Sequence, residues 1–209
     1  MRLGTTLQLS ASDLSNHLSC EHLTALNLQV AEGKLERPVY HDAGLEVLIE
    51  RGLQHEAAYI DHLKERGIDV VEIAEEIGRQ QAADETLRAM QDGAGAIVQA
   101  TLTSEGWMGR ADVLLRVGTS SKLGSWSYEV HDTKLARETK GGSILQLCLY
   151  SDLVGGIQEH LPERICVVRP GTDYQPDEYR VAEYLAYYRH VRRRLNEAVS
   201  KPKGGPTTY

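Results

Sequence analysis

The chain has 209 residues, of which 41% are hydrophobic and 25% are charged. This length and balance suit one folded domain with a sizeable core, and they exclude a largely disordered chain. The formal net charge of -7 argues against a protein that coats nucleic acid through bulk positive charge, but an acidic metal site remains compatible with it.

Segment types that direct a protein to a membrane or out of the cell are missing from the sequence. No apolar run approaches the ~20 residues that a membrane-spanning helix needs, so no membrane partner is expected. The first residues lack the charged-then-apolar layout of a secretory signal. The cysteines, Cys20, Cys148 and Cys166, are too few and too scattered for a disulfide framework. These features predict a cytoplasmic protein in a reducing setting.

Helical patterns dominate the first third of the chain. Ser10 or Ser12 can cap a helix that runs to about residue 30, and a charged connector ending in Pro38 follows. A long amphipathic helix is predicted over 42–66, with Gly67 ending it. Its buried stripe is expected to consist of Leu45, Leu48, Ile49, Leu53, Ala57, Ile60 and Leu63.

Strand patterns dominate the middle. Before the middle of the chain, we expect a short strand over 70–73 and a helix over 79–90 that ends at Gly93. Stretches rich in β-branched and aromatic residues, separated by glycine or serine turns, predict an antiparallel meander over 96–103, 107–117 and 125–133.

The last third returns to helices. Helical spacing predicts helices over 143–154 and 182–199, with a strand over 164–168 and a further candidate strand over 178–181 between them. The order of elements predicts an α/β or α+β fold with a central mixed β-sheet flanked by helices and an N-terminal helical segment. We expect one domain over 1–200, with a helical part (9–67), a sheet core (68–181), a C-terminal helix (182–199) and then a flexible tail (201–209).

An acid and a lysine close the strand over 125–133. Side chains alternate along a strand, so Asp132 and Lys134 share the face of the apolar Val130, while Glu129 and His131 point the other way. Burying either charge without a partner is costly. The pair can therefore be a strand-end salt bridge, or the carboxylate can hold a metal cation while the ammonium holds a water or a phosphate oxygen.

A second carboxylate lies on the preceding strand. Asp112 follows Gly109 at the start of an apolar run, and pairing within the meander would bring it near Asp132. Neighbouring carboxylates repel unless a divalent cation lies between them, and oxygen ligands suit magnesium or manganese. Asp112 alone can equally be a turn acid.

Other polar side chains could reach the same place. His55 lies on the long helix, where a lone histidine is more often a surface or core residue than a ligand, although the flanking Leu53 and Ala57 would turn it to the core. Gln146 and Tyr150 stand one helical turn apart and could hold a DNA backbone or merely pack. Arginines at 189 and 192–194 form either a solvated helix face or a phosphate-contacting stripe.

These elements together resemble the RecB-like branch of the PD-(D/E)xK nuclease superfamily. The matching elements are Gly52-x-x-His55, Gly109-Arg-Ala-Asp112, Asp132-Thr-Lys134 and Gln146-x-x-x-Tyr150, in that order. Each is weak alone, and the ordered set is specific. The resemblance runs from about residue 9 to about 195 and is greatest to nuclease domains that open large bacterial proteins with a helicase-like portion downstream.

The resemblance implies a restriction-endonuclease-like core and a role for each matching residue. Asp112 and Asp132 would bind magnesium or manganese, with His55 and the Thr133 carbonyl as further ligands. Lys134 would be the catalytic lysine. Gln146, Tyr150, Arg110 and Arg137 would contact DNA or brace the site. The implied partners are DNA, as single strands or ends, and a helicase-like protein that is covalently linked or separate.

One departure leaves the function open. Many nucleases of this branch bind a 4Fe–4S cluster through one early cysteine and a C-terminal trio. Cys20 sits where the early ligand would, but no cysteine follows Cys166, so we expect no cluster here. Either the chain is part of a longer protein or its lineage lacks the cluster. The activity expected is metal-dependent hydrolysis of DNA in repair or defence, and the alternative is a nuclease-fold module that binds DNA or a partner without cutting.

Overall fold

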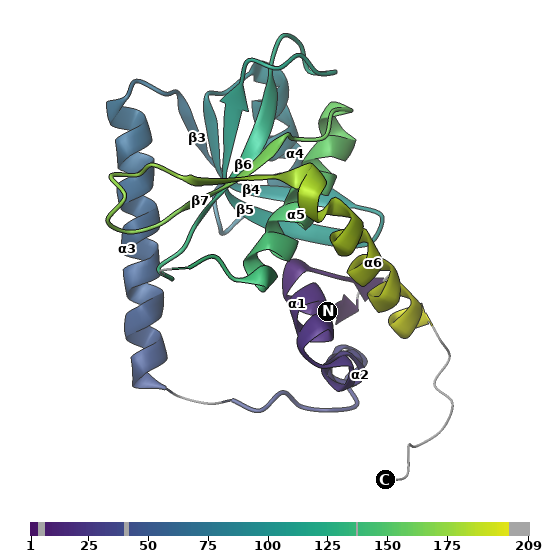
Figure 1. The fold of residues 1–209 in the computed structure, drawn as a ribbon. Coiled ribbons are helices and arrows are strands. Elements are labelled where there is room, and N and C mark those ends of the chain that lie inside the picture. Colours follow the sequence, from purple (N-terminus) through teal and green to yellow (C-terminus); the bar gives the residue numbers. More distant parts are fainter. Residues whose placement is uncertain (4–6, 40–41, 137, 201–209) are drawn as a thin grey trace.

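A six-stranded mixed sheet with helices on both faces forms the body of the protein (Figure 1). This computed structural model describes residues 1–3, 7–39, 42–136 and 138–200. In chain order the elements are β1 (Arg2–Leu3), β2 (Leu7–Gln8), α1 (Ala11–Ser19), α2 (Glu21–Ala31), α3 (Ala43–Glu65), β3 (Val70–Glu72), α4 (Arg79–Asp92), β4 (Ala96–Ser104), β5 (Trp107–Val117), β6 (Ser127–Thr133), α5 (Gly141–Gln158), β7 (Arg164–Val168), β8 (Asp177–Arg180) and α6 (Val181–Ser200).

The strands of the sheet follow one another in the order of the sequence, from β3 to β8. Strands β4, β5 and β6 form the antiparallel meander that the turn residues predict. Only the β3–β4 and β6–β7 pairs of this sheet are parallel, and helices α4 and α5 make those crossovers. The expected α/β fold with a central mixed sheet is therefore confirmed. The short β1–β2 hairpin was not predicted.

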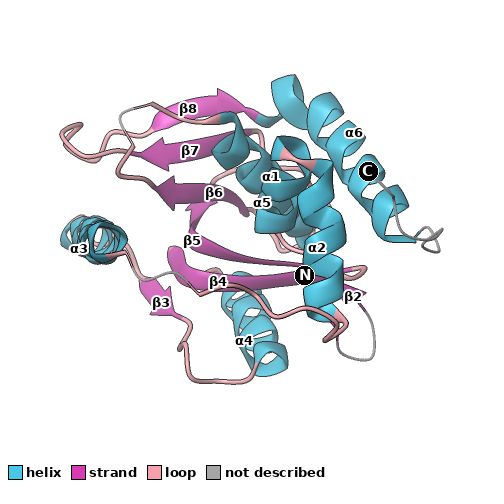
Figure 2. Cartoon of the chain, turned by 90° about the horizontal axis from the view of Figure 1, so that it is seen from below, coloured by secondary structure: helices cyan, strands magenta, loops and turns pink. Residues whose placement is uncertain are grey.

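The two faces of the sheet are covered unequally (Figure 2). Helices α4 and α5 pack on one face, and α1 and α6 lie against α5, so this side holds the larger core. Helix α3 covers the other face with a smaller cluster that contains Tyr59 and Leu63. Site residues contributed by α5 and by α3 therefore approach the sheet from opposite sides.

The single helix expected up to residue 30 is in fact a pair. The break is at Cys20, whose extended backbone (φ -162°, ψ 114°) ends α1 and begins α2. The predicted start is confirmed, because Ser10 is the N-cap and its amide donates to the Asp13 carboxylate at 2.9 Å. The N-terminal ammonium also binds Asp13, at 2.7 Å. The apolar spacing could not reveal the break, because both helices keep leucines near helical intervals.

The expected buried stripe of α3 is wrong over its first half. Leu45, Leu48, Ile49 and Leu53 are between 52% and 62% exposed. The face that meets the sheet carries His55, Glu56, Tyr59 and Leu63, which is one helical stripe of mixed polarity. Every residue over 44–51 is exposed, so the first half of α3 extends past the sheet and buries no face there. Hydrophobic periodicity could not show where the sheet ends.

The remaining elements agree closely with the predictions. Gly93 ends α4 in the left-handed conformation (φ 76°), and Gly67 follows α3 with φ 74°. The candidate strand before the last helix is β8. No helix among the described residues is long and apolar enough to cross a membrane. The predicted tail, 201–209, lies outside those residues.

Candidate active site

The end of β6 brings an acid and a lysine together. Asp132 is 1% exposed and faces α5, on the same side as the buried Val130. The ammonium of Lys134 straddles its carboxylate, with Nζ 2.8 Å from Oδ1 and 2.7 Å from Oδ2. Only the contact to Oδ1 has hydrogen-bond geometry. Because the Lys134 side chain is 31% exposed, it forms the boundary between the buried carboxylate and solvent.

Asp112 occupies the point where the ladder between β5 and β6 ends. The last pair there is Val113 with His131, so Asp112 comes next to Asp132 as the meander predicts. Both the amide and the hydroxyl of Thr133 donate to Oδ2 of Asp112, at 2.9 and 3.1 Å. The Asp112 carboxylate thus replaces a backbone acceptor of the ladder. Sequence reasoning assigned Thr133 only a carbonyl and missed these donors.

The neighbouring charge of Asp112 changes the protonation of Asp132. Burial first, and then the nearby charge of Asp112, raise the pKa of Asp132 to about 7, although the Lys134 ammonium opposes the shift. The Asp112 and Asp132 side chains are close enough to hydrogen-bond to each other when one is protonated. A cation that reaches this point would displace that proton, since it stabilises both charged forms.

Helix α5 braces the pair from one side. Gln146 Nε2 donates to Oδ1 of Asp132 at 3.2 Å. Tyr150, one turn later, is 7% exposed, and its ring lies against Gly109 of β5. A Cβ at Gly109 would be 2.4 Å from that ring, so only glycine leaves room for it. Gln146 therefore contacts the Asp132 carboxylate directly, whereas Tyr150 packs between strand and helix and interacts with Gln146.

His55 reaches the strand ends from α3 but does not touch the carboxylates. Its Nε2 lies 3.1 Å from the carbonyl oxygen of Val168, which also accepts from the Lys134 amide. The reason given for its orientation was wrong, because Leu53 and Ala57 are both exposed. His55 faces the sheet because it lies on the same side of α3 as the buried Tyr59 and Leu63.

Glu56 and Gln99 belong to this region and were missed by the sequence reasoning. Gln99, on β4, donates from Nε2 to Glu56. Gln99 and Asp112 both lie between the paired positions 98–113 and 100–111 of β4 and β5. The Gln99 φ of 55° is left-handed, which is strained for a residue other than glycine. Burial first, and then the charge of Asp112, raise the pKa of Glu56. In the sequence, the position of Glu56 directly after His55 is the feature that could have indicated its place near the site.

Three further residues expected at the site are placed elsewhere or not described. Arg110 forms an ion pair with Glu75 at 3.0 Å, on the exposed side of β5. Arg137 lies outside the described residues. Cys20 is exposed at the junction of α1 and α2, while Cys148 and Cys166 are buried as expected.

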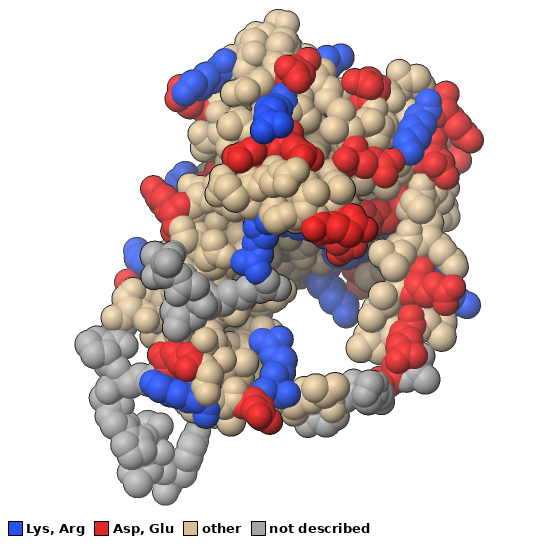
Figure 3. Space-filling model, turned by 180° about the vertical axis from the view of Figure 1, so that it is seen from behind, with Lys and Arg blue, Asp and Glu red and all other residues tan. Residues whose placement is uncertain are grey.

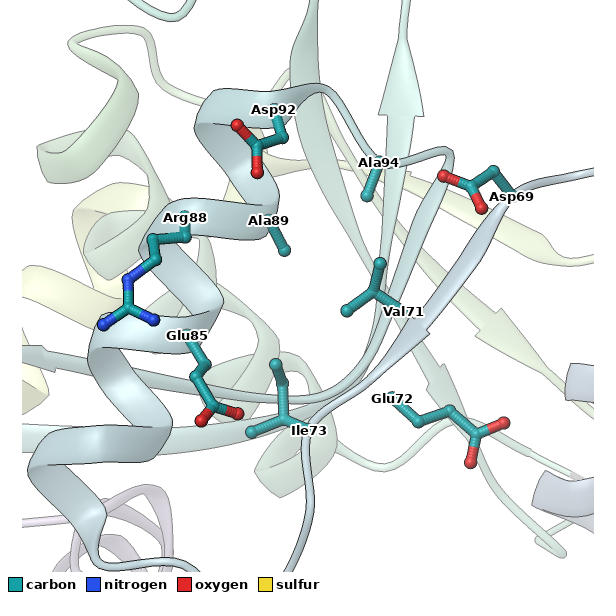
Figure 4. A pocket seen from close by; sticks show the side chains of 9 residues that line it. All are labelled: Asp69, Val71, Glu72, Ile73, Glu85, Arg88, Ala89, Asp92 and Ala94. Carbon is teal, nitrogen blue, oxygen red and sulfur yellow. The ribbon is translucent and has the colours of Figure 1, made fainter.

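Within the described part of the chain, no three His, Cys, Asp or Glu side chains are grouped closely enough to hold a metal ion. Asp112 and Asp132 meet, but His55 is held at the Val168 carbonyl. A hollow of about 420 Å³ lies between β3 and α4, and Figure 4 shows that the carboxylates around it point apart. On the face drawn in Figure 3, basic side chains are interspersed with acidic ones.

Comparison with known proteins assigns neither a family nor a function to this site. No protein-family model matches the chain, and no curated protein sequence matches it. The site is therefore defined by its own contacts, chiefly those of Asp112, Asp132, Thr133, Lys134 and Gln146.

Proposed function

We propose that the chain is a magnesium- or manganese-dependent deoxyribonuclease with a restriction-endonuclease-like core of the RecB-like branch. The observation that carries the proposal is the Asp112–Asp132–Lys134 cluster. Its central carboxylate is 1% exposed, yet it lies beside a second carboxylate, and a lysine closes the solvent side. A fold gains no stability from placing like charges together in a buried position, so the cluster suits a cation-binding task.

The residues fit such a cation on the carboxylate side. Asp112 and Asp132 would hold it, since Oδ2 of Asp132 accepts no hydrogen bond and the two acids repel each other. A bound divalent cation would stabilise the charge that develops on the cleaved phosphate and lower the pKa of a water. His55 and the Thr133 carbonyl are the proposed additional ligands, and His55 would have to leave the Val168 carbonyl to serve.

The other residues have roles that follow from their contacts. Lys134, partly exposed, would release the carboxylate once a cation neutralises it, and would then orient a water or a phosphate oxygen. Thr133 keeps Asp112 aligned through two hydrogen bonds. Gln146 keeps Asp132 aligned from α5, and the packing of Tyr150 on Gly109 fixes that helix.

The test is cleavage of labelled single-stranded and double-stranded DNA with manganese or magnesium. The wild-type chain should cut, and Lys134→Ala and Asp132→Asn should reduce the rate by at least about 100-fold. Lys122→Ala is the matched control, because Lys122 pairs with Glu159 on the surface. Manganese binding measured by calorimetry should persist in Lys134→Ala and disappear in Asp132→Asn.

The salt-bridge alternative gives different results. If Asp132 and Lys134 are only a structural pair, manganese binds no better to the wild type than to Asp132→Asn, and no cleavage exceeds that of the variants. DNA binding with neither metal binding nor cleavage would identify the chain as a nuclease-fold binding module instead.

A further inference from the structure

A second hollow lies on the α3 face of the sheet, behind the strand that carries Asp132. It measures about 330 Å³, at the lower end of the range of small-molecule pockets. Glu129 and His131 of β6 line it, and they point away from Asp132 because side chains alternate along the strand. The hollow is therefore separate from the carboxylate cluster, although both use β6.

Aromatic rings form one wall of the hollow. Tyr174, from the loop between β7 and β8, stacks on His62 at 4.6 Å between ring centroids and on Tyr59 at 6.1 Å. Figure 1 shows this loop reaching over α3. Asp173 and Tyr174 have φ values of 50° and 57°. Two consecutive residues other than glycine are therefore in the strained left-handed region where the loop holds the Tyr174 ring. A flat wall of this kind suits a planar ligand ring.

Two residues that line the hollow, Glu129 and His131, each have a polar atom without a partner among the described residues. Oε1 of Glu129 accepts from the Arg164 amide at 3.2 Å, and among the described residues nothing donates to Oε2. Burial raises the pKa of Glu129, because the carboxylate is partly removed from water, although the Arg164 amide opposes the shift. Nδ1 of His131 bonds to the Tyr59 hydroxyl at 2.9 Å, and its Nε2 has no partner in the described part of the chain. The hollow thus offers an acceptor with negative charge beside a ring nitrogen.

The rim carries charges of both signs, and one arginine on it is unpaired among the described residues. Arg66, which follows α3, makes no side-chain hydrogen bond or ion pair with any described residue. Arg164, at the start of β7, pairs with Glu178 at 2.8 Å on the surface. A free guanidinium near a half-buried carboxylate favours a ligand that has an anionic group at one end and hydrogen-bond donors at the other.

We propose that this hollow binds a nucleotide whose base carries an exocyclic amino group. The base would stack along the wall of Tyr174, Tyr59 and His62 and donate its amino hydrogens to Glu129. The phosphate would lie at Arg66. Adenine, cytosine and guanine have the amino group and thymine lacks it, so the site should discriminate between them. The nucleotide can come from two sources, a free mononucleotide or a residue within a DNA strand.

The test uses the full chain carrying Lys134→Ala, without divalent metal, so that binding does not depend on nuclease activity. Calorimetric titration should show that dAMP, dCMP and dGMP bind about tenfold more tightly than dTMP. Glu129→Leu should remove this difference. Arg66→Ala should weaken all four nucleotides about tenfold and leave the nucleosides unchanged. Tyr174→Ala should weaken nucleotides and nucleosides alike.

The controls separate binding from folding. Arg88→Ala, on α4 beside the other hollow, should leave every affinity unchanged. If Glu129→Leu fails to fold, Glu129→Gln keeps the side-chain shape and should weaken the amino-bearing nucleotides by removing the charge. Displacement of dAMP by an oligodeoxyadenylate identifies a strand as the source, and simultaneous binding of both identifies a free nucleotide.

No saturable binding at millimolar nucleotide would overturn the proposal, as would affinities that Glu129→Leu and Tyr174→Ala leave unchanged. Failure of DNA cleavage would leave these binding measurements untouched, so this inference and the proposed nuclease activity can fail separately.

Discussion

Gly109→Ala tests the idea that a glycine on β5 sets the position of α5 at the candidate site. The added Cβ would lie 2.4 Å from Cε1 and 2.5 Å from Cδ1 of Tyr150, whereas ordinary contacts begin at 3.4 Å. The ring must therefore retreat by about 1 Å, and it is 7% exposed, with packed neighbours behind it.

Overpacking of this kind costs about 1–3 kcal/mol in the free energy of unfolding. For a chain of this length, that predicts a melting temperature lower by about 2–12 °C, measured by circular dichroism or calorimetry. DNA cleavage should fall as well, because the retreat of Tyr150 displaces Gln146, which holds Asp132. Gly156→Ala is the matched control, since its Cβ meets nothing within 4 Å and the change should stabilise α5 by up to about 1 kcal/mol.

A double-mutant cycle isolates the contact. In a Tyr150→Leu background the ring atoms that clash are gone, so Gly109→Ala should cost much less than in the wild type. The reasoning is refuted if Gly109→Ala costs less than about 0.5 kcal/mol, or if its cost is the same in both backgrounds.

Further predictions concern charge. Asp112→Asn should raise the free energy of unfolding above pH 7 by about 0.5–2 kcal/mol, because it removes repulsion from Asp132, while cleavage falls at least about 100-fold; a destabilised variant would contradict this. Arg192→Ala should cost about 1–3 kcal/mol in chemical denaturation, since Arg192 binds Asp152 at 2.5 Å and lies over the Trp107 ring. Arg193→Ala, an exposed neighbour, should stay within about 0.5 kcal/mol. Burial lowers the pKa of His17 below 6.5, so the unfolded chain binds more protons than the folded one as the pH falls below 6.5. Stability should drop over that range and drop less in His17→Leu, with the exposed His22→Leu as control; parallel pH profiles would refute the idea.

The strands and the site residues on β5, β6 and α5 were largely predictable from the sequence. Glycine and serine turns fixed the limits of the meander, and pairing within a meander obliges Asp112 to lie near Asp132. Gln146 follows from helical spacing in the crossover that returns β6 to β7. These inferences succeeded because each depends on local geometry.

The contribution of α3 was less predictable because it depends on a distant partner. Apolar spacing placed Leu45 and Leu53 in the core, yet the sheet meets the face with His55 and Glu56. The residues around Gln99 in the sequence do not predict that its backbone is in the left-handed conformation on a central strand. The break at Cys20 likewise depends on tertiary packing, since both flanking helices keep their own apolar spacing.

The attachment of α3 sets the order in which the molecule should open. This helix buries only Tyr59 and Leu63 of its described side chains, and its first half stands beyond the sheet with exposed leucines. By contrast, Asp112, Asp132 and Gln146 belong to a strand pair and a crossover helix that lie in the main core. Native-state hydrogen exchange should therefore release α3 amides well before those of α5, as a separate cooperative unit. In that partly open form the carboxylate cluster would stay assembled. His55, Glu56, Tyr59 and His62 would leave with α3, while Tyr174 would stay on the loop between β7 and β8.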